Sequence, residues 1–408
     1  MTRSHRGTVC AAAVLLSVGA AALQSQQPAL PRSDANGNPI RQATKTGHIS
    51  NYDEAKVPAY TLPEPLVFAN GSPVRTASDW TARRRAEVLR LYESNVFGRI
   101  PTTTPRVNWI VKEDHGPKKL VVGTIGTAAS APQISLTLNL PLNARGPVPV
   151  ILMLSFGGGG TPVADPPVAN EIFKRGWGYA IVGYSDIQPD RINTFDRGVI
   201  GATSATAPGP EEWGTIAAWS WGVSRIVDYL QTDKAVDGKK IALFGHSRLG
   251  KTALWASALD ERIAAVFSSC SGEMGAALSR RDWGETVDDM AQNFSYQFAG
   301  NFQKWAGRWN EMPVDAHMLL ALSAPRPVFI TGGTQDQWAD PVGEFLAQVA
   351  AGPVYRLLGK KDLGVSALPA LDTPVVTGDL GFHYHTGGHT ATPADWQSFL
   401  TFVEKYFK

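Results

Sequence analysis

The stretch Lys-Ile-Ala-Leu-Phe-Gly-His-Ser-Arg-Leu-Gly-Lys, residues 240–251, decides the fold of this chain. It opens with an apolar run, residues 241–244, that predicts a buried strand, and residues 251–259 beyond it predict a helix. Glycines near Ser247 permit a tight turn between these elements, and the helix start directs backbone N–H groups toward developing negative charge. A serine on such a turn is presented as a nucleophile, so we predict acyl-ester chemistry at Ser247.

This stretch departs from the usual nucleophile elbow of α/β hydrolases. The elbow reads Gly-x-Ser-x-Gly, whereas Leu249 stands at the position of the second glycine and Gly250 follows one residue later. A strand–turn–helix with a surface serine that takes no part in chemistry is the alternative reading of this motif by itself.

Buried strands and helices alternate along the chain around this stretch. Apolar or alternating runs predict strands within 107–140 and at 148–156, 179–184, 241–244, 264–268 and 328–331. Helical spacing predicts helices at 78–97, 168–175, 211–230, 251–259 and from about 392 onward, and a long loop is expected over 186–210. This order predicts an α/β-hydrolase fold, a three-layer sandwich in which helices flank a mostly parallel central sheet.

The N-terminus indicates an exported protein. Arg3 and Arg6 precede a short apolar run that ends in small residues, so residues 1–22 predict a secretory signal peptide, and its length is too short to span a membrane. We expect residues 23–58 to form a linker or surface arm, and 59–408 a single catalytic domain with a capping insertion near 273–324. The expected product is a secreted or periplasmic monomer that has no membrane contact after signal cleavage.

Charge and cysteine content exclude several classes of protein. Without residues 1–22 the chain has 36 Lys and Arg against 36 Asp and Glu, because Arg3 and Arg6 are removed from a total of 38 basic residues. A net charge near zero argues against nucleic acid as the main partner. Cys270 would then be the single cysteine, so no intrachain disulfide is possible and stability must come from the 43% hydrophobic residues.

A serine nucleophile needs a base and an acid, which follow the serine in chain order in α/β hydrolases. The loop 332–340 follows the strand expected at 327–331, and Asp336 is our candidate acid. Asp340 directly precedes a proline, where a cap for the next helix is the simpler role.

Three histidines lie near the C-terminus, at His383, His385 and His389. His389 follows two glycines, which free the loop to carry it toward Ser247, so His389 is the predicted base and His385 the second choice. Three histidines also raise the possibility of zinc, but spacings of two and four residues in a Gly-rich loop disfavour it, and we expect no metal or other cofactor.

Two segments offer donors for the oxyanion of the reaction. The first segment is Arg248, which offers its backbone N–H and its side chain. The charged guanidinium is a stronger hydrogen-bond donor than a neutral N–H group. The glycine run 157–160 follows an expected strand, in the position of the oxyanion loop of esterases, although a flexible loop without a chemical role is equally compatible.

With these residues in place, Gly-His-Ser-Arg-Leu-Gly-Lys, residues 245–251, resembles the G-C/H-S-R-x-G-K signature of glucuronoyl esterases, carbohydrate esterase family fifteen. The resemblance covers most of the mature chain, and it is closer to the bacterial than to the fungal branch. Further stretches that carry it are 92–101, 276–281, 324–327 and 387–389.

The resemblance implies hydrolysis of the ester between 4-O-methyl-D-glucuronoyl groups of glucuronoxylan and lignin alcohols. It implies that Ser247 is the nucleophile, His389 the base and Arg248 the oxyanion donor. It also implies that sugar hydroxyls are bound by three further side chains, Lys251, Glu285 and Trp338.

The chain departs from this family at the position of one acid. Many members carry Glu-Ser-Gly after the strand that follows the nucleophile, and here the sequence is Cys270-Ser271-Gly272. Glu273 lies nearby but out of register, which leaves Asp336 as the acid. His246 is a second departure, since it replaces the cysteine of the fungal signature.

Two other functions stay open at the level of sequence. A different carbohydrate esterase, such as an acetylxylan esterase, could use the same scaffold, because a fold does not fix a substrate. A non-catalytic carbohydrate-binding protein is the second alternative, and the intact serine, acid and histidine order argues against it.

Overall fold

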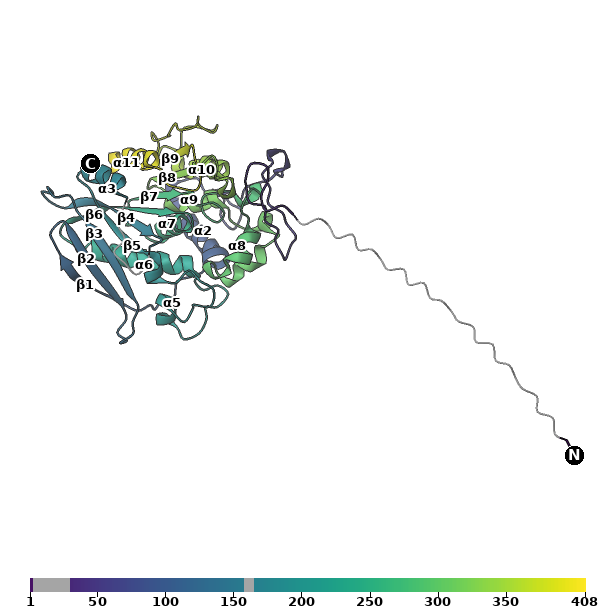
Figure 1. Ribbon diagram of the computed structural model, residues 1–408. Coiled ribbons are helices and arrows are strands. Elements are labelled where there is room, and N and C mark those ends of the chain that lie inside the picture. The colour runs from purple at the N-terminus through teal and green to yellow at the C-terminus, as the bar shows by residue number, and fades with distance from the viewer. Residues whose placement is uncertain (3–29, 158–164) are drawn as a thin grey trace.

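A computed structural model describes residues 1–2, 30–157 and 165–408 of the chain (Figure 1). The predicted signal peptide, beyond its first two residues, therefore lies outside the described residues. The same holds for Gly158, Gly159 and Gly160 of the glycine run.

A nine-stranded sheet forms the centre of the described molecule (Figure 1). Its strands, in the spatial order β1-β2-β3-β5-β4-β6-β7-β8-β9, are β1 (Val107–Asp114), β2 (Lys118–Ile125), β3 (Gln133–Asn139), β5 (Gly178–Gly183), β4 (Val148–Ser155), β6 (Val236–His246), β7 (Ala265–Ser269), β8 (Val328–Gly333) and β9 (Leu380–His385). The neighbouring pairs β1–β2, β2–β3 and β3–β5 are antiparallel. The five remaining pairs, from β5–β4 to β8–β9 in this spatial order, are parallel. The expected mostly parallel sheet is confirmed.

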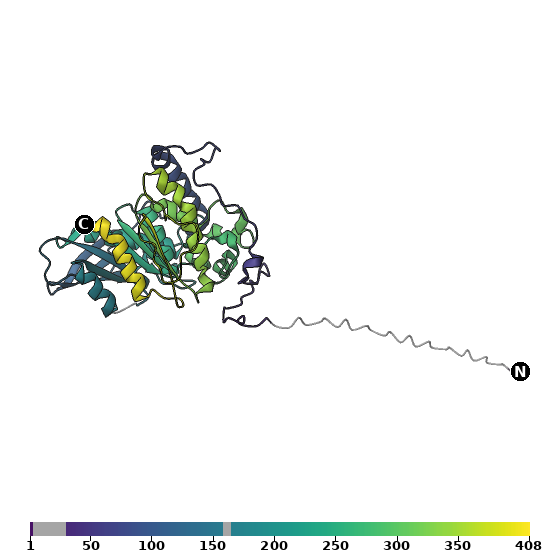
Figure 2. The same cartoon turned by 90° about the horizontal axis from the view of Figure 1, so that it is seen from above.

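Helices cover both faces of this sheet, as expected for a three-layer sandwich. One face packs against α2 (Arg85–Tyr92), α6 (Thr215–Leu230), α7 (Arg248–Leu259), α9 (Ala316–Ser323) and α10 (Pro341–Leu357). The other packs against α3 (Pro166–Lys174) and α11 (Pro393–Phe407). Figure 2 shows α11, in yellow, and α10, in yellow-green, on opposite sides of the strands.

Strands covered on both faces explain the continuous apolar runs of the sequence. In β8, Val328 and Ile330 face one core while Phe329 between them faces the other, and all three are fully buried. The predicted helix at 78–97 is also present as one helical segment, Ala77 to Phe97, which includes two π-helical turns at Trp80–Arg84 and Glu93–Phe97.

Two expectations about loops were wrong. The segment 186–210 begins inside α4 (Tyr184–Ile187) and contains α5 (Gly198–Thr203). Residues 381–385 belong to β9 rather than to a Gly-rich loop. The strand was concealed because its buried polar residues, His383 and His385, read as surface residues in the sequence.

The segment predicted as a capping insertion, 273–324, is built from short helices. They are η4 (Ser279–Arg281), α8 (Val287–Asn293), η5 (Ser295–Gln297), η6 (Gly300–Trp305), η7 (Trp309–Glu311) and α9. Of these, α9 packs with α7 and α10 in the helical layer, whereas residues between Glu285 and Gln297 border a cavity that Ser247 also lines.

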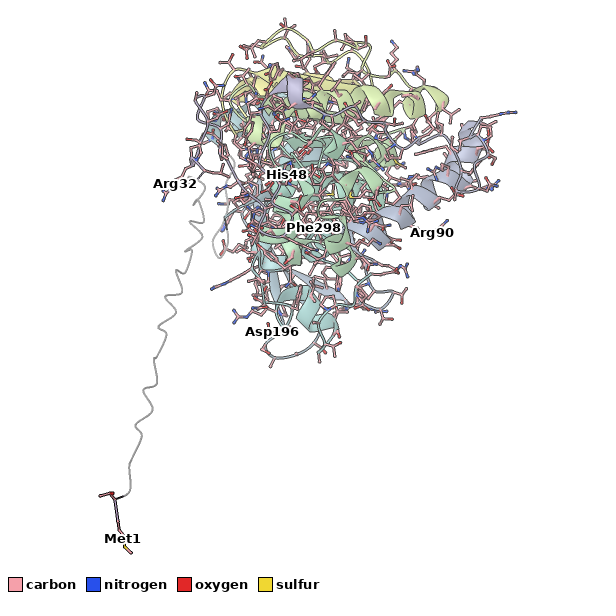
Figure 3. All side chains as sticks on the ribbon, turned by 90° about the vertical axis from the view of Figure 1, so that its right-hand side faces the viewer. Met1, Arg32, His48, Arg90, Asp196 and Phe298 are labelled. Atoms are coloured by element: carbon pink, nitrogen blue, oxygen red, sulfur yellow. The ribbon has the colours of Figure 1, made fainter. Side chains whose placement is uncertain are left out.

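The N-terminal segment 30–58, with its short helix η1 (Glu54–Lys56), is docked against this insertion (Figure 3). His48 Nε2 pairs with Asp282 at 2.7 Å, and the backbone N–H of Thr44 donates to Gln292 Oε1 at 2.6 Å. Figure 3 views this side, with Arg32 and His48 labelled. Over the described ranges, no helix has both the length and the apolar character needed to cross a bilayer.

Candidate active site

Ser247 lies on a sharp turn between β6 and α7, as the sequence predicts. Its backbone angles are φ 56° and ψ −129°, a region that non-glycine residues rarely occupy, so the turn stores strain. The turn is held by the backbone, because Ser247 N–H donates to the carbonyl of Ser269 at 2.8 Å. Such a conformation projects the serine side chain away from the sheet edge, and Ser247 borders a cavity of about 580 Å³.

The displaced glycine of the motif has a steric explanation. A Cβ built on Gly250 would lie 2.8 Å from Ser268 Oγ and 2.9 Å from Ser271 Cβ, so this position admits only glycine without rearrangement. Leu249, where the usual motif has glycine, is fully buried in the core. Gly250 therefore lets α7 pack closely against the end of β7, one residue after the position of the glycine in the usual motif.

Asp336 and His389 meet at the same cavity. Asp336 follows β8 and His389 follows β9, and the His389 Nδ1 to Asp336 Oδ2 distance is 2.6 Å. The Asp336 side chain is 5% exposed and that of His389 is 43% exposed. A carboxylate at Nδ1 fixes the proton on that nitrogen, which leaves Nε2 as a proton acceptor.

His246 packs beside this pair, with its ring centroid 4.6 Å from that of His389. Burial, reinforced by the neighbouring His389, lowers the pKa of His246 to about 4. A neutral ring at this position adds no positive charge next to His389 near neutral pH.

Arg248 extends into the cavity from the first position of α7. Its Nη1 forms an ion pair with Asp190, and its guanidinium carbon lies 5.1 Å from the centre of the Phe294 ring. Asp190 is itself held, since Gln297 Nε2 donates to its Oδ1 at 2.7 Å. The guanidinium is thus fixed on one edge and one face, and the remaining edge is available to a ligand.

Lys251, Glu285 and Trp338 form one wall of the cavity. Trp338 Nε1 donates to Glu285 Oε1 at 2.9 Å, and Lys251 Nζ lies 3.5 Å from Glu285 Oε2. Burial raises the pKa of Glu285, and the neighbouring Lys251 opposes that shift. The wall combines a cation, a carboxylate and an indole, which suits a ligand rich in hydroxyl groups.

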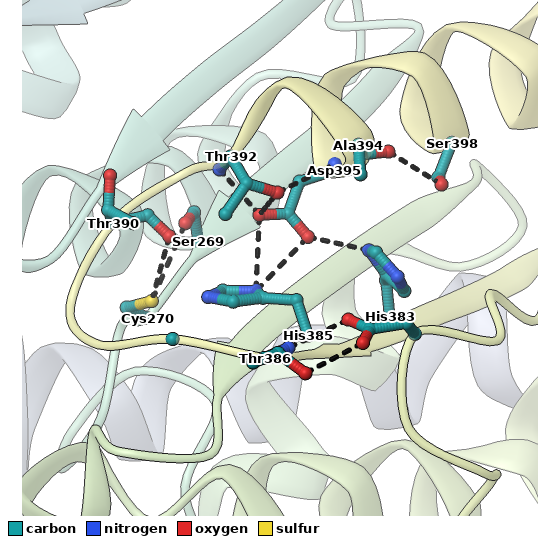
Figure 4. Close-up of polar contacts among 12 residues, drawn as sticks. Ser269, Cys270, His383, His385, Thr386, Thr390, Thr392, Ala394, Asp395 and Ser398 are labelled. Carbon is teal, nitrogen blue, oxygen red and sulfur yellow. Dashed lines mark hydrogen bonds and ion pairs between the residues drawn. The ribbon is translucent and has the colours of Figure 1, made fainter.

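His383 and His385 do not join His389. Both rings bond through Nδ1 to Asp395 Oδ1, at 2.7 and 3.2 Å, and both side chains are buried (Figure 4). His385 Nε2 also lies 3.3 Å from the carbonyl of Gly388, so this ring braces the loop that carries His389. The three histidines therefore do not gather as ligands of one metal.

Glu273 also lies away from the cavity. It is buried and accepts a hydrogen bond from Ser279 Oγ at 2.6 Å. Burial raises the pKa of Glu273 well above its usual range.

Several cavity residues gave no signal in the sequence. Gln297 and Phe294 reach the site from the insertion, and Pro39 and Arg41 reach it from the N-terminal segment. Asp190 comes from the segment after β5, whose position at the carboxyl edge of the parallel strands was the one available indication.

Comparison with known proteins places these features among relatives. A family model described as glucuronyl esterase of fungi matches residues 124–359. A carbohydrate esterase of an unknown prokaryotic organism is 38% identical over 400 residues, which cover 87% of this chain and 92% of the relative. A 4-O-methyl-glucuronoyl methylesterase of Phanerochaete carnosa is 30% identical over 322 residues, covering 74% of this chain and 73% of that protein.

A solved structure of similar architecture is the glucuronoyl esterase from Solibacter usitatus. It is 40% identical, aligns with a TM-score of 0.81, and the alignment covers 87% of this chain and 100% of the solved one. The bacterial relatives are thus more similar to this chain than the fungal one, in line with the sequence expectation.

Proposed function

We propose that Ser247, His389 and Asp336 carry out the hydrolysis of 4-O-methyl-D-glucuronoyl esters. The chain belongs to the glucuronoyl esterase family and is a carboxylic ester hydrolase. The observation that carries the assignment of residues is the 2.6 Å bond between His389 Nδ1 and Asp336 Oδ2, beside a serine on a strained elbow. The proposed substrate is the ester that joins glucuronoyl groups of glucuronoxylan to lignin alcohols.

The reaction begins with Ser247 Oγ attacking the uronoyl carbonyl while His389 Nε2 takes the hydroxyl proton. Asp336 stabilises the imidazolium that forms. His389 then gives the proton to the leaving alcohol, and the C–O bond to that alcohol breaks. Water, deprotonated by His389, attacks the acyl-enzyme and releases the free uronic acid and Ser247.

Arg248 supplies the charge that balances the oxyanion of each tetrahedral intermediate. Its guanidinium is fixed by Asp190 and Phe294 before substrate binds, so little reorganisation is needed during the reaction. The first turn of α7 adds backbone N–H donors on the same side.

The sugar ring fits the wall of Lys251, Glu285 and Trp338. Lys251 donates to ring hydroxyls and Glu285 accepts from them, while Trp338 offers an apolar face. An acetyl group could not use these partners, so this wall favours a uronoyl ester over the acetylxylan alternative.

The leaving alcohol lies on the open side of the site. His389, which protonates it, has a side chain that is 43% exposed. A bulky aromatic alcohol can therefore project into solvent, which is compatible with lignin alcohols on a polymer. We further propose that the chain acts as an exported monomer, secreted or periplasmic, and needs no cofactor.

The test compares turnover of benzyl D-glucuronate with turnover of p-nitrophenyl acetate by the wild type and by Ser247→Ala. The proposal predicts a clear preference for the glucuronate ester and loss of both activities in Ser247→Ala. Unchanged glucuronate turnover in this variant would exclude Ser247 as nucleophile. Binding of xylan oligosaccharides without any ester turnover would favour a carbohydrate-binding protein instead.

A further inference from the structure

We propose that Cys270, Asp336 and His389 form an inhibitory zinc site inside the active centre. A zinc ion held there would occupy the catalytic histidine and switch the esterase off. The inhibition rests on the proposed catalytic roles of Asp336 and His389, whereas binding of the metal does not.

The three side chains come from neighbouring strands of the parallel sheet. Cys270 directly follows β7, Asp336 follows β8 and His389 follows β9, so the carboxyl ends of adjacent strands bring them together. The cysteine sulfur, a carboxylate oxygen and an imidazole nitrogen all lie within 4.8 Å of one another. All three residues border the cavity, so an ion can reach them from solvent.

These ligand types and separations suit zinc. Zinc binds thiolate sulfur at about 2.3 Å and imidazole nitrogen at about 2.0–2.1 Å, which places tetrahedral ligand atoms about 3.5 Å apart. The cavity leaves the fourth position to a water molecule, so the site needs no further protein ligand.

Cys270 is poorly engaged in its present surroundings. Its sulfur has two weak contacts, each 3.7 Å long, with Ser269 Oγ and with the carbonyl of Thr390 (Figure 4). Burial raises the pKa of the thiol well above its usual range. Because both contacts are weak, little interaction energy is lost when the sulfur turns away from them toward a cation.

Protons and charges balance when zinc binds. The Cys270 thiol loses its proton to solvent, and the His389 proton moves from Nδ1 to Nε2 so that Nδ1 can coordinate the metal. One thiolate and the Asp336 carboxylate neutralise the two charges of Zn²⁺, which avoids an unpaired charge beneath the cavity floor. Nε2 then carries a hydrogen and cannot accept the proton of Ser247.

The nearby histidine pair does not compete for the ion. His383 and His385 are buried against a shared carboxylate, Asp395, which also caps α11 through Thr392. In the described ranges, the cluster of Cys270, Asp336 and His389 is the single place where three such ligand atoms gather.

The first test is a titration of the full chain with zinc at buffered free concentrations, with glucuronate ester turnover as the readout. Each variant is normalised to its own zinc-free rate. The wild type should be inhibited and should recover fully when a chelator is added. Cys270→Ser should need at least about tenfold more free zinc for half inhibition, because a hydroxyl is a far poorer ligand than a thiolate.

The matched control is His115→Gln, which removes an exposed imidazole between β1 and β2, outside the lining of the cavity, and should show the same zinc sensitivity as the wild type. Equal sensitivity of Cys270→Ser and wild type would overturn the proposal.

Cobalt supplies a readout that does not depend on catalysis. Co²⁺ bound to a thiolate gives a sulfur-to-metal charge-transfer absorption, which should appear in the wild type and in Ser247→Ala. It should be absent in Cys270→Ser. Absence of this absorption in all three proteins would show that no thiolate site forms. Cobalt binding by a wild-type protein that shows no turnover of glucuronate esters would show instead that the proposed function had failed.

Discussion

Asp190 is the residue whose importance the sequence conceals most completely. It lies 58 positions before Arg248, and no motif links the two, yet its carboxylate holds the guanidinium from the side. The Asp190 side chain is 6% exposed and that of Arg248 is 31% exposed, so the carboxylate end of the ion pair is shielded from solvent. We therefore regard it as a positioning residue for the oxyanion donor.

Asp190→Asn is expected to lower kcat by about 10- to 100-fold with little change in KM, because a misplaced donor acts mainly in the transition state. In an Arg248→Ala background, Asp190→Asn should cause almost no further loss of kcat, because the guanidinium that Asp190 positions is absent. Steady-state kinetics of the four proteins measure this coupling.

Asp260→Asn is the control for a general loss of stability. Asp260 is also a buried carboxylate, paired with Arg262 at 2.7 Å at the opposite end of α7. The Asp260→Asn substitution should lower the melting temperature without changing kcat. Additive losses in Asp190→Asn and Arg248→Ala would contradict the positioning role.

At the scale of the element, the junction of α7 with β7 depends on a glycine. Gly250→Ala would place its methyl carbon 2.8 Å from Ser268 Oγ and 2.9 Å from Ser271 Cβ, and we expect a loss of about 1–3 kcal/mol of unfolding free energy. Gly146→Ala is the control, because a Cβ there meets no atom within 4 Å. Denaturant unfolding measures both, and equal stability of the two variants would refute this packing account.

The first turn of α10 carries a buried carboxyl group, Glu344, that bonds the turn after β7. Its Oε1 accepts from the N–H of Gly272 at 2.9 Å and from Ser271 Oγ at 3.1 Å, while its Oε2 has no partner among the described residues. Burial raises the pKa of Glu344 to about 8. The folded protein therefore holds a proton that the unfolded chain releases near pH 4.5.

This shift makes stability fall as pH rises. Between about pH 4.5 and 8 the folded state binds the extra proton, so the free energy of unfolding decreases by up to about 1.4 kcal/mol per pH unit. Glu344→Gln removes this dependence, and its melting temperature should gain on the wild type as pH increases to 8. Glu404→Gln, on the exposed side of α11, should keep the wild-type pH profile. A parallel profile for Glu344→Gln and wild type would exclude this buried proton.

Elements were predictable from sequence to the extent that hydrophobic side chains define them. The apolar runs gave β4 and β8 because both faces of those strands are covered by helices. β9 escaped prediction because its buried histidines satisfy their polarity through Asp395 of α11, a partner ten or more positions away. Tertiary hydrogen bonds of this kind leave no local pattern.

At the scale of the whole molecule, the site is assembled from distant parts of the chain. Chain order alone could pair Ser247 with Asp336 and His389, since the parallel sheet places successive strand ends side by side. The sequence predicted a capping insertion near 273–324, but chain order could not reveal that Phe294 of this insertion and Pro39 and Arg41 of the N-terminal segment border the same cavity. Those contacts follow from docking of surface segments, which depends on shape rather than on periodicity.

Under the proposed mechanism, the whole-molecule arrangement supplies an acid although the position after β7 is a cysteine. Asp336, one strand further along on the loop after β8, bonds Nδ1 of His389. Cys270 then remains beside the pair as a thiol, and Glu273 is turned away into the core.

The most direct test of this account is the kcat of Asp336→Asn on benzyl D-glucuronate. The substitution keeps the shape of the side chain but removes the charge that fixes the His389 tautomer, so kcat should fall by about 10³- to 10⁴-fold. A kcat within about tenfold of the wild type would contradict the assignment of Asp336 as the acid of the catalytic triad.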